Sequence, residues 1–430
     1  MRRVMVVGGG GREHALAWKL RQSPRLGELF VAPGNAGTAA LATNLDIRAN
    51  DIDGLVAAAK EHRVELVIVG PEEPLARGLA DRLQHEGIAV YGPSKDGARI
   101  EASKGWARQL CARYGIPHPA FAVFSDWRDA RSYIMSLSRP PVVKADGLAG
   151  GKGSFVCRSK EEALEVVERL MRQEALGGAG RTVVVEERLE GPEVSAHAFT
   201  DGRNTIPMPM ACDYKRLLDG DEGPNTGGMG AYSPAYWLDE ITERAIHERV
   251  TEAVVQALAQ EGVQYKGTLY PGLMITPKGP MVLEFNCRFG DPEAQVLLPR
   301  LKGDLLEICW AVANGSLEGV EVEWAPEACV GVVMASGGYP DEYQVGLPIY
   351  GLASAQGEGV IIFHAGTALA DDGRTVLTAG GRVVTVVAVA STISEARAKA
   401  YYAVQHIHFS RCHYRKDIAA PSQRAATGGE

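Results

Sequence analysis

The first hundred residues alternate between short apolar runs and longer segments with polar residues at helical spacing. Four apolar runs predict short buried strands at 4–7, 29–32, 64–69 and 88–91. Residues 12–21 and the segment that follows GPEEP predict helices between them. Short apolar strands separated by helices are typical of a parallel sheet covered on both faces. We therefore expect a doubly wound α/β domain over residues 1–102, with ligands near the carboxyl ends of its strands.

The pattern changes from about residue 103. Helical spacing predicts helices at 103–114 and 240–261, and apolar runs predict strands at 141–145, 182–187, 195–200 and 281–286. Residues 210–235 are polar and glycine-rich, and they are too long for an idle loop in a compact domain. From about 328 a last segment predicts strands at its start and at 360–364 and 382–390, then a helix at 394–409. The polar residues after 419 predict a disordered tail over 421–430.

Composition indicates a soluble protein of several domains. A chain of 430 residues exceeds one ordinary core, and no apolar run approaches the roughly 20 residues that span a bilayer. The seven cysteines are scattered without a CxxC pair, which is typical of free thiols in a reducing cytoplasm. The start MRRVMVVGGGG breaks into glycines too early for a signal peptide. The net charge of −8 argues against a general nucleic-acid binder.

A glycine run follows the first predicted strand. Backbone N–H groups of Gly9, Gly10 and Gly11, at the start of a helix, can bind an anion. The dinucleotide fingerprint GxGxxG fails here, because Glu13 or His14 stands in its last glycine position and no acid ends the second strand. The phosphate of a small sugar fits better. A nicotinamide cofactor and a tight turn without a ligand remain as alternatives.

A second glycine-rich segment, KADGLAGGKG, lies between two predicted strands. Lys144 and Lys152 flank its glycines, which suits a flap over nucleotide phosphates. It is no Walker A loop, because Gly153 follows Lys152. A hairpin with solvated lysines is the alternative. The strand that ends in Glu186 and leads to Glu193 offers carboxylates and free backbone groups to a nucleotide, although a solvated strand end explains it equally well.

The long stretch from Asp213 to Gly230 combines cations, an amide, a hydroxyl and bare backbone. Lys215, Asn225 and Thr226 stand beside three glycines, which permit close approach of an anionic or hydroxylated substrate. A disordered insertion is the alternative. However, the apolar Met229 within the stretch is unusual for one.

The stretch EFNCRFGDPE places unusual polar groups at the end of a buried strand. Alternation puts Glu284, Asn286 and Arg288 on one face. Carboxylate and amide oxygens are ligands that Mg²⁺ prefers, and an arginine beside them can hold a carboxylate or phosphate. A structural salt bridge between Glu284 and Arg288 is the alternative, but it leaves Asn286 unexplained. We favour a structural or surface role over a metal site for the histidines at 406, 408 and 413.

These motifs together resemble the ATP-grasp superfamily and, within it, the glycinamide ribonucleotide synthetase family. The resemblance runs through nearly the whole chain, and its most specific strings are NTGGMGAYSP and EFNCRFGDPE. It implies a pre-ATP-grasp domain at 1–102 and an ATP-grasp domain of two α+β subdomains at 103–327, with the flap subdomain at about 120–190. It also implies a small mixed α/β domain at 328–420.

The family's reaction implies that ATP, glycine and 5-phosphoribosylamine give glycinamide ribonucleotide, ADP and phosphate, an early step of purine synthesis. The carboxylate of glycine would become a glycyl phosphate, which the amine attacks. Such transfer depends on charge neutralisation and alignment more than on a protein nucleophile. The resemblance also implies Mg²⁺ or Mn²⁺, a cytoplasmic monomer or weak dimer, and transient contact with the enzyme that makes phosphoribosylamine. Neither nucleic acid nor a membrane is an expected partner.

The resemblance assigns roles by motif. Lys104 and Lys144 would contact ATP phosphates, Glu186 and the Leu189 backbone adenine, and Glu193 the ribose. Glu284 and Asn286 would hold the metal. Arg288, Lys144 and Asp213 are the expected catalytic residues. The expected substrate-binding residues are Gly9, Gly10, Gly11, Asp213, Lys215, Asn225, Thr226, Gly227, Gly228 and Arg288.

Three departures from the family pattern stand out. Gly150 replaces an alanine of the flap, Tyr214 replaces a histidine, and residues 271–274 lack the acid that many ATP-grasp enzymes place before the metal strand. Three other functions remain open. They are a related purine enzyme such as a carboxyaminoimidazole ribonucleotide synthase, a nicotinamide-dependent oxidoreductase, and a non-catalytic nucleotide sensor.

Overall fold

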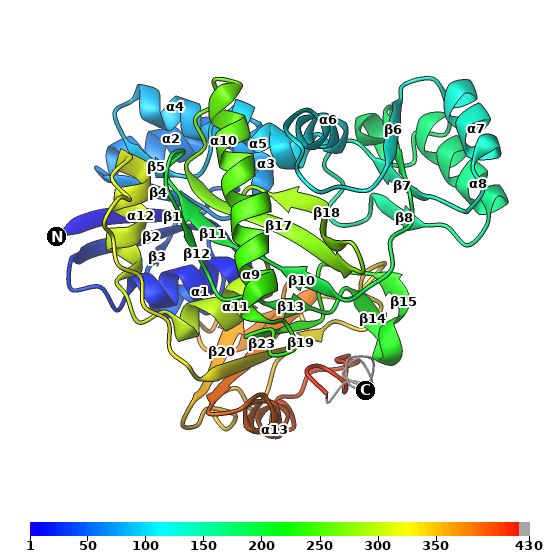
Figure 1. Ribbon diagram of the computed structural model, residues 1–430. Helices are drawn as coiled ribbons and strands as arrows, with labels where there is room; N and C mark the ends of the chain where they lie inside the picture. The colour runs from blue at the N-terminus through cyan, green and yellow to red at the C-terminus, as the bar shows by residue number, and fades with distance from the viewer. Residues whose placement is uncertain (421–430) are drawn as a thin grey trace.

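The N-terminal part is built on a five-stranded parallel sheet. The computed structural model describes residues 1–420, and the predicted disordered tail at 421–430 lies outside them (Figure 1). The strand order is β3-β2-β1-β4-β5, which confirms the predicted doubly wound sheet. Its strands are β1 (Arg2–Gly8), β2 (Leu26–Pro33), β3 (Thr43–Asn44), β4 (Leu66–Val69) and β5 (Ala89–Tyr91). Its helices are α1 (Gly11–Leu20), α2 (Ile52–Glu61), α3 (Glu72–Ala76), α4 (Leu79–His85) and α5 (Lys95–Ala102).

Helix α6 (Lys104–Tyr114) leads from this domain to a smaller one. Ser103 caps its first turn by accepting from Trp106 N, and Gly115 ends it in the left-handed conformation. The next unit has the antiparallel sheet β6-β9-β7-β8 and two helices, and it projects from the rest of the molecule (Figure 1). Its elements are β6 (Phe121–Phe124), α7 (Trp127–Ser136), β7 (Val142–Ala145), β8 (Ser154–Val156), α8 (Lys160–Met171) and β9 (Val183–Glu186).

The predicted flap is a hairpin of this sheet. Strands β7 and β8 pair antiparallel, and the glycine-rich loop joins them, as the sequence predicts. A separate apolar cluster, which includes Val143, Val167, Leu170 and Val185, forms the core of the unit. The flap is therefore carried by a unit with its own small core.

A second antiparallel sheet carries the predicted metal strand. Its strands are β10 (Glu193–Ser195), β11 (Ala198–Thr200), β12 (Thr205–Pro207), β17 (Gly267–Thr276) and β18 (Gly279–Asn286). The prediction of one strand at 195–200 is wrong, because β10 and β11 are separate. Both pair with β17 in a continuous register, and the interruption lies beside Pro271, which has no N–H to donate. Beside this sheet runs a helix at 240–260, made of α9 (Glu240–Ile246), a π turn (His247–Glu252) and α10 (Ala253–Gln260).

The stretch at 210–235 is not a simple loop. It forms β13 (Cys212–Asp213), the hairpin β14 (Arg216–Leu218) and β15 (Glu222–Asn225), and β16 (Gly230–Ser233). Strands β13 and β16 join the sheet β13-β16-β19-β23-β20 with three strands of the C-terminal segment. Those three are β19 (Ala328–Ala335), β20 (Val360–His364) and β23 (Arg382–Ala390). The C-terminal sheet is thus completed by strands from the middle of the chain.

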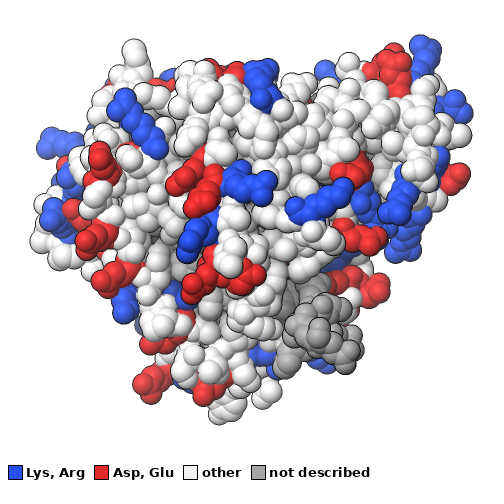
Figure 2. All heavy atoms as spheres, viewed as in Figure 1, with Lys and Arg blue, Asp and Glu red and all other residues white. Residues whose placement is uncertain are grey.

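The remaining elements close the structure around this sheet. Helix α11 (Glu293–Leu297) follows the metal strand, α12 (Leu305–Asn314) packs near β5, and β21 (Thr367–Leu369) pairs with β22 (Val376–Thr378). Helix α13 (Ile393–Val404) ends earlier than the predicted 409, because His408 forms a backbone bridge with Tyr350. Within residues 1–420, no helix is long and apolar enough to cross a membrane. Acidic and basic side chains are intermixed over the face shown in Figure 2.

Candidate active site

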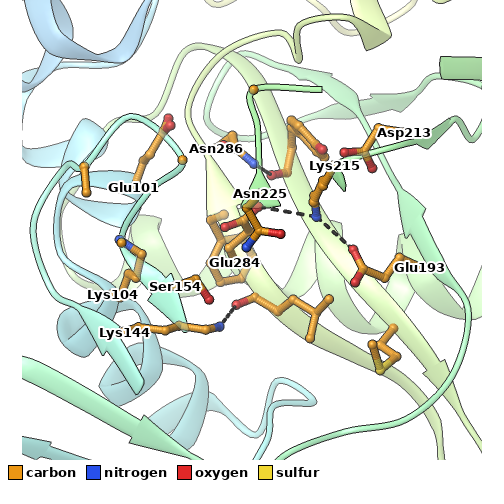
Figure 3. Close-up of a pocket in the computed structure, with 18 of the residues that line it drawn as sticks. Glu101, Lys104, Lys144, Ser154, Glu193, Asp213, Lys215, Asn225, Glu284 and Asn286 are labelled. Carbon is orange, nitrogen blue, oxygen red and sulfur yellow. Dashed lines mark hydrogen bonds and ion pairs between the residues drawn. The ribbon is translucent and has the colours of Figure 1, made fainter. Parts of the chain in front are cut away.

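A cavity of about 650 Å³ opens where the N-terminal domain, the flap unit, the second sheet and the C-terminal sheet meet. Most of the predicted site residues line it (Figure 3). They are Lys104, Lys144, Glu186, Leu189, Glu193, Asp213, Lys215, Asn225, Thr226, Gly227, Glu284, Asn286 and Arg288. Among the described residues, Gly9, Gly10, Gly11 and Gly228 are not part of its wall.

At the end of β9, the hinge that leads out of the flap unit, a buried ion triad anchors Glu186. Its carboxylate lies 2.8 Å from Lys144 Nζ and accepts from Arg108 Nε at 2.7 Å and Nη2 at 3.2 Å. Burial alone would raise the pKa of Glu186, but Lys144 and Arg108 lower it to about 2. Both cations also donate to Leu283 O, at 2.7 and 2.6 Å. The Glu186 carboxylate is therefore engaged with protein cations, and the triad ties the end of β9 to β18.

The sequence interpretation missed Arg108. It stands four residues after Lys104 on α6, so both side chains lie on one helix face, and this spacing was the available signal. Lys104 Nζ donates to Gly147 O of the flap at 3.2 Å. Glu187, the other acid at the end of β9, accepts from Ala120 N at 2.9 Å. Leu189 follows it in the wall of the cavity.

The predicted metal ligands lie at the end of β18. Asn286 donates a hydrogen bond from Nδ2 to Tyr270 O at 3.4 Å, and its amide oxygen takes no part in that bond. Burial would raise the pKa of Glu284, but Lys215, Lys144 and Lys104 lower it, so the carboxylate is charged near neutral pH. Residues 1–420 contain no group of three or more His, Cys, Asp or Glu side chains arranged for a metal. A hard cation fits the oxygens of Glu284 and Asn286, and phosphate oxygens would have to complete its coordination.

Lys215 lies between several carboxylates. Its Nζ is 2.8 Å from Glu193 Oε2 and 3.8 Å from Glu284 Oε1 (Figure 3). Burial raises the pKa of Asp213 to about 7. The nearby Lys215 lowers this pKa, whereas the nearby Glu293 raises it. Asp213 can therefore exchange a proton near neutral pH.

Glu293 is a further acid of the cavity that the sequence interpretation did not single out, although it ends the EFNCRFGDPE stretch. Tyr270 donates its hydroxyl to Glu293 Oε1 at 2.5 Å. Ser195 Oγ lies 3.3 Å from the same oxygen and 3.4 Å from Asp213 Oδ1. A hydroxyl network thus joins the two carboxylates.

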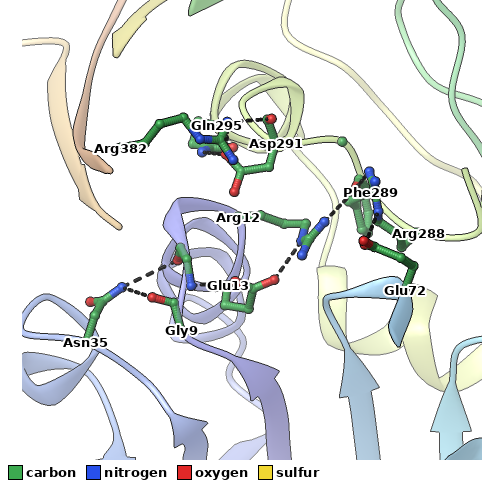
Figure 4. Close-up of polar contacts among 12 residues, drawn as sticks. Gly9, Arg12, Glu13, Asn35, Glu72, Arg288, Phe289, Asp291, Gln295 and Arg382 are labelled. Carbon is green, nitrogen blue, oxygen red and sulfur yellow. Dashed lines mark hydrogen bonds and ion pairs between the residues drawn. The ribbon is translucent and has the colours of Figure 1, made fainter. Parts of the chain in front are cut away.

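Arg288 is positioned by the N-terminal domain. Its guanidinium donates to Glu72 at 3.0 Å, and Nη1 donates to Phe289 O at 3.2 Å (Figure 4). It also donates to Glu101 at 2.9 Å. The alternative of a salt bridge between Glu284 and Arg288 does not occur. Burial would raise the pKa of Glu72, but Arg288 lowers it to about 2. Glu72 and Glu101, from α3 and α5, therefore fix where Arg288 meets the cavity.

At the glycine run, Arg12 reaches the cavity wall and the three glycines do not. Gly10 N donates to Glu13 Oε2 at 2.6 Å, so this N–H is occupied by the chain itself. Arg12 Nε donates to Glu13 Oε1 at 2.6 Å, and Arg12 Nη1 donates to Phe289 O at 3.1 Å (Figure 4). An anion at this edge of the cavity would meet Arg12 before the glycine backbone.

The structure shows the surroundings of two departures from the family pattern, Tyr214 and Gly150. The hydroxyl of Tyr214 accepts from Ala419 N at 2.9 Å, and the Arg415 guanidinium lies 4.8 Å from its ring centroid. Tyr214 thus anchors the C-terminal end of the described chain. A Cβ at Gly150 would meet nothing within 4 Å. Of the three late histidines, His413 contacts the Leu217 carbonyl at 2.9 Å, in keeping with a structural role.

Comparison with known proteins places these features in one family. Three domains of phosphoribosylglycinamide synthetase match the chain: the N domain at residues 2–101, the ATP-grasp (A) domain at 102–294 and the C domain at 329–421. A phosphoribosylamine–glycine ligase of Caldanaerobacter subterraneus is 46% identical over 97% of this chain and 99% of its own length. A trifunctional purine biosynthetic protein of Gallus gallus is 49% identical over 97% of this chain but only 42% of its own length.

Solved structures agree with this placement. The crystal structure of a phosphoribosylamine–glycine ligase from Thermotoga maritima has a TM-score of 0.85 at 36% identity and covers 97% of this chain and 100% of its own. An N5-carboxyaminoimidazole ribonucleotide synthetase from the same organism has a TM-score of 0.64 at 17% identity, over 95% of this chain and 99% of its own, which shows a shared fold alone. The chain therefore belongs to the phosphoribosylglycinamide synthetase family.

Proposed function

We propose that the chain is an ATP-dependent carbon–nitrogen ligase that joins glycine to 5-phosphoribosylamine in purine biosynthesis. One observation carries this function. The Glu284 and Asn286 oxygens share one cavity with Lys104, Lys144 and the proton-exchanging Asp213. Such a cavity offers cations for a triphosphate, oxygens for a divalent cation and a group that can exchange a proton.

The first step makes the glycine carboxylate electrophilic. One of its oxygens attacks the γ-phosphorus of ATP, the bond to ADP breaks, and glycyl phosphate forms. Lys144 and Lys104 balance the charge on the phosphates. Glu284 and Asn286 would hold Mg²⁺ or Mn²⁺, and the bound ion would supply further charge neutralisation. Arg288, fixed by Glu72 and Glu101, orients the glycine carboxylate.

The second step forms the amide bond. The amine of phosphoribosylamine attacks the carbonyl carbon of glycyl phosphate, the carbon–oxygen bond to phosphate breaks, and inorganic phosphate leaves. The nitrogen loses a proton, which Asp213 accepts because its pKa lies near 7. The sugar phosphate lies at the edge of the cavity that Arg12 lines, next to the Gly9–Gly11 turn, with Lys215 toward the reacting end. The hinge residues Glu186 and Leu189 border the adenine, and Glu193 borders the ribose.

The surroundings of the enzyme are part of the same proposal. It acts in the cytoplasm as a monomer or weak dimer. Because its amine substrate is unstable, it contacts the enzyme that produces phosphoribosylamine, and only transiently.

Phosphate release tests the proposal. The protein is incubated with ATP and Mg²⁺, and glycine and phosphoribosylamine, formed in situ from ribose 5-phosphate and ammonia, are omitted in turn. Release that requires both substrates, with glycinamide ribonucleotide detected by mass, supports the ligase. Turnover without glycine would favour a carboxyaminoimidazole-type enzyme, and absence of any turnover would favour a nucleotide sensor.

A further inference from the structure

The turn Thr226–Gly228, which borders the cavity beside Asn225, has little free backbone. Thr226 N donates to Lys215 O at 2.7 Å, and Gly228 N donates to Thr226 Oγ1 at 3.0 Å. Gly227 N donates to the hydroxyl of Tyr339 at 2.9 Å. All three backbone N–H groups of the turn are therefore already used inside the protein. A substrate beside the turn would therefore meet its shape rather than free N–H groups.

Two side chains of the C-terminal domain, Tyr339 and Arg382, hold this turn, and Arg382 also lines the cavity. Tyr339 accepts the Gly227 N–H, and Arg382 Nη1 donates to Gly227 O at 2.7 Å and to Asp291 O at 2.8 Å. Arg382 also lies 3.3 Å from the Asp291 carboxylate. Both polar groups of residue 227 are thus bound by residues more than a hundred positions away in the sequence.

A side chain on Gly227 would press on both Tyr339 and Arg382. A Cβ on Gly227 would lie 3.1 Å from Arg382 Cζ and 3.2 Å from the Tyr339 hydroxyl. A Cβ on Gly381 would lie 2.3 Å from Cδ2 of the Tyr339 ring, so that ring rests directly on the backbone next to Arg382. The two side chains and the turn form one tightly packed contact.

The flap touches the same segment of the C-terminal domain. Lys152 Nζ donates to Pro340 O at 3.1 Å, one residue after Tyr339. Gly151 at the tip of the flap and Thr226 of the turn both line the cavity. Residues 339–340 therefore contact the Thr226–Gly228 turn through the Tyr339 hydroxyl and the flap through the Pro340 carbonyl.

We propose that Tyr339 and Arg382 are positioning residues, which set the Thr226–Gly228 turn for glycine, and that Tyr339–Pro340 couples this turn to flap closure. The inference rests on the proposed function, because Arg288, which would orient the glycine carboxylate there, lines the same cavity as the turn. Through Tyr339, the C-terminal domain thereby affects substrate affinity, although the Tyr339 side chain itself does not contact the substrate. Lys152 then has a docking role in addition to any contact with the nucleotide.

Steady-state kinetics of Tyr339→Phe test the positioning role, with Tyr343→Phe as the matched control. The Tyr343 ring lies 6.3 Å from that of Tyr339 and is 40% exposed. We expect Tyr339→Phe to raise the glycine KM by roughly five- to tenfold, the effect of one lost hydrogen bond, while the ATP KM changes by less than about twofold. The positioning role would be overturned if Tyr339→Phe and Tyr343→Phe changed the glycine KM equally. It would also be overturned if Tyr339→Phe changed the glycine and ATP KM values by the same factor. Arg382→Lys, which keeps the charge beside Asp291, provides a second variant with the same expected split.

A double-mutant cycle with Lys152→Met tests the coupling. If residues 339–340 link flap and turn, the double variant with Tyr339→Phe loses less kcat/KM for glycine than the product of the two single losses. Losses that multiply would overturn the coupling. Wild-type protein measured alongside separates the two hypotheses: an inactive wild type refutes the proposed ligase, whereas an active wild type with unaffected variants refutes only the positioning role.

Discussion

The hinge triad makes a strong prediction about stability. Arg108→Met removes one of the two cations of Glu186 and keeps a long, helix-favouring side chain on α6. The Arg108 side chain is 3% exposed and that of Glu186 is 2% exposed, so water cannot replace the lost bonds at 2.7 and 3.2 Å. Breaking a buried ion pair from one side costs about 3–5 kcal/mol, because the remaining charge stays buried with less compensation. Lys144 retains part of that compensation, so we expect the lower end, about 3 kcal/mol.

The same helix provides the matched control. Arg113 also pairs with a glutamate, Glu261, but its side chain is 60% exposed. Arg113→Met should therefore leave the free energy of unfolding almost unchanged, since solvent screens such pairs. Urea denaturation of both variants, followed by tryptophan fluorescence, measures the difference. Equal midpoints for Arg108→Met and Arg113→Met would refute the reasoning that the triad is a buried structural unit.

Two substitutions test the cavity, and a matched pair of glycine substitutions tests the packing beside it. Glu284→Gln should lower kcat by about a hundredfold or more, measured by Mg²⁺ titration at fixed ATP, because a charged metal ligand is lost. Asp213→Asn should raise the melting temperature more at pH 8 than at pH 5. The reason is that the raised Asp213 pKa, about 7 against a usual 3.8, makes folding less favourable as pH rises through that window. Gly228→Ala should cost about 2 kcal/mol or more of stability, because φ is +112° and the new Cβ would lie 2.5 Å from Pro292 Cδ. Gly220→Ala, where φ is +71° and nothing lies within 4 Å, should cost less in the same denaturation assay.

Contrary outcomes are equally specific. Normal turnover of Glu284→Gln at low Mg²⁺ would remove Glu284 from the metal site. A melting-temperature difference for Asp213→Asn that is the same at both pH values would show that Asp213 titrates normally. Equal losses for the two alanine variants would show that Pro292 yields to the added methyl group.

Local pattern predicted many of the elements and most of the residues that line the cavity. Alternating apolar runs predicted the parallel sheet, the glycine loop predicted the flap hairpin, and strand alternation put Glu284 and Asn286 on one face. These features depend on residues close in sequence, whose relative geometry is set by helix and strand periods. The resemblance of whole motifs supplied the family, which the comparisons confirm.

The local pattern did not show which distant residues hold each polar group of the site in place. Arg108 anchors Glu186 from 78 residues away, Glu72 and Glu101 fix Arg288, and Tyr339 holds Gly227 from 112 residues away. The completion of the C-terminal sheet by β13 and β16 was equally hidden. Sequence determined which polar groups the chain presents, because strand and helix periodicity acts locally. Only the tertiary structure decided which of those groups are paired and which remain open to a substrate, because burial and ion pairing arise when distant segments pack together.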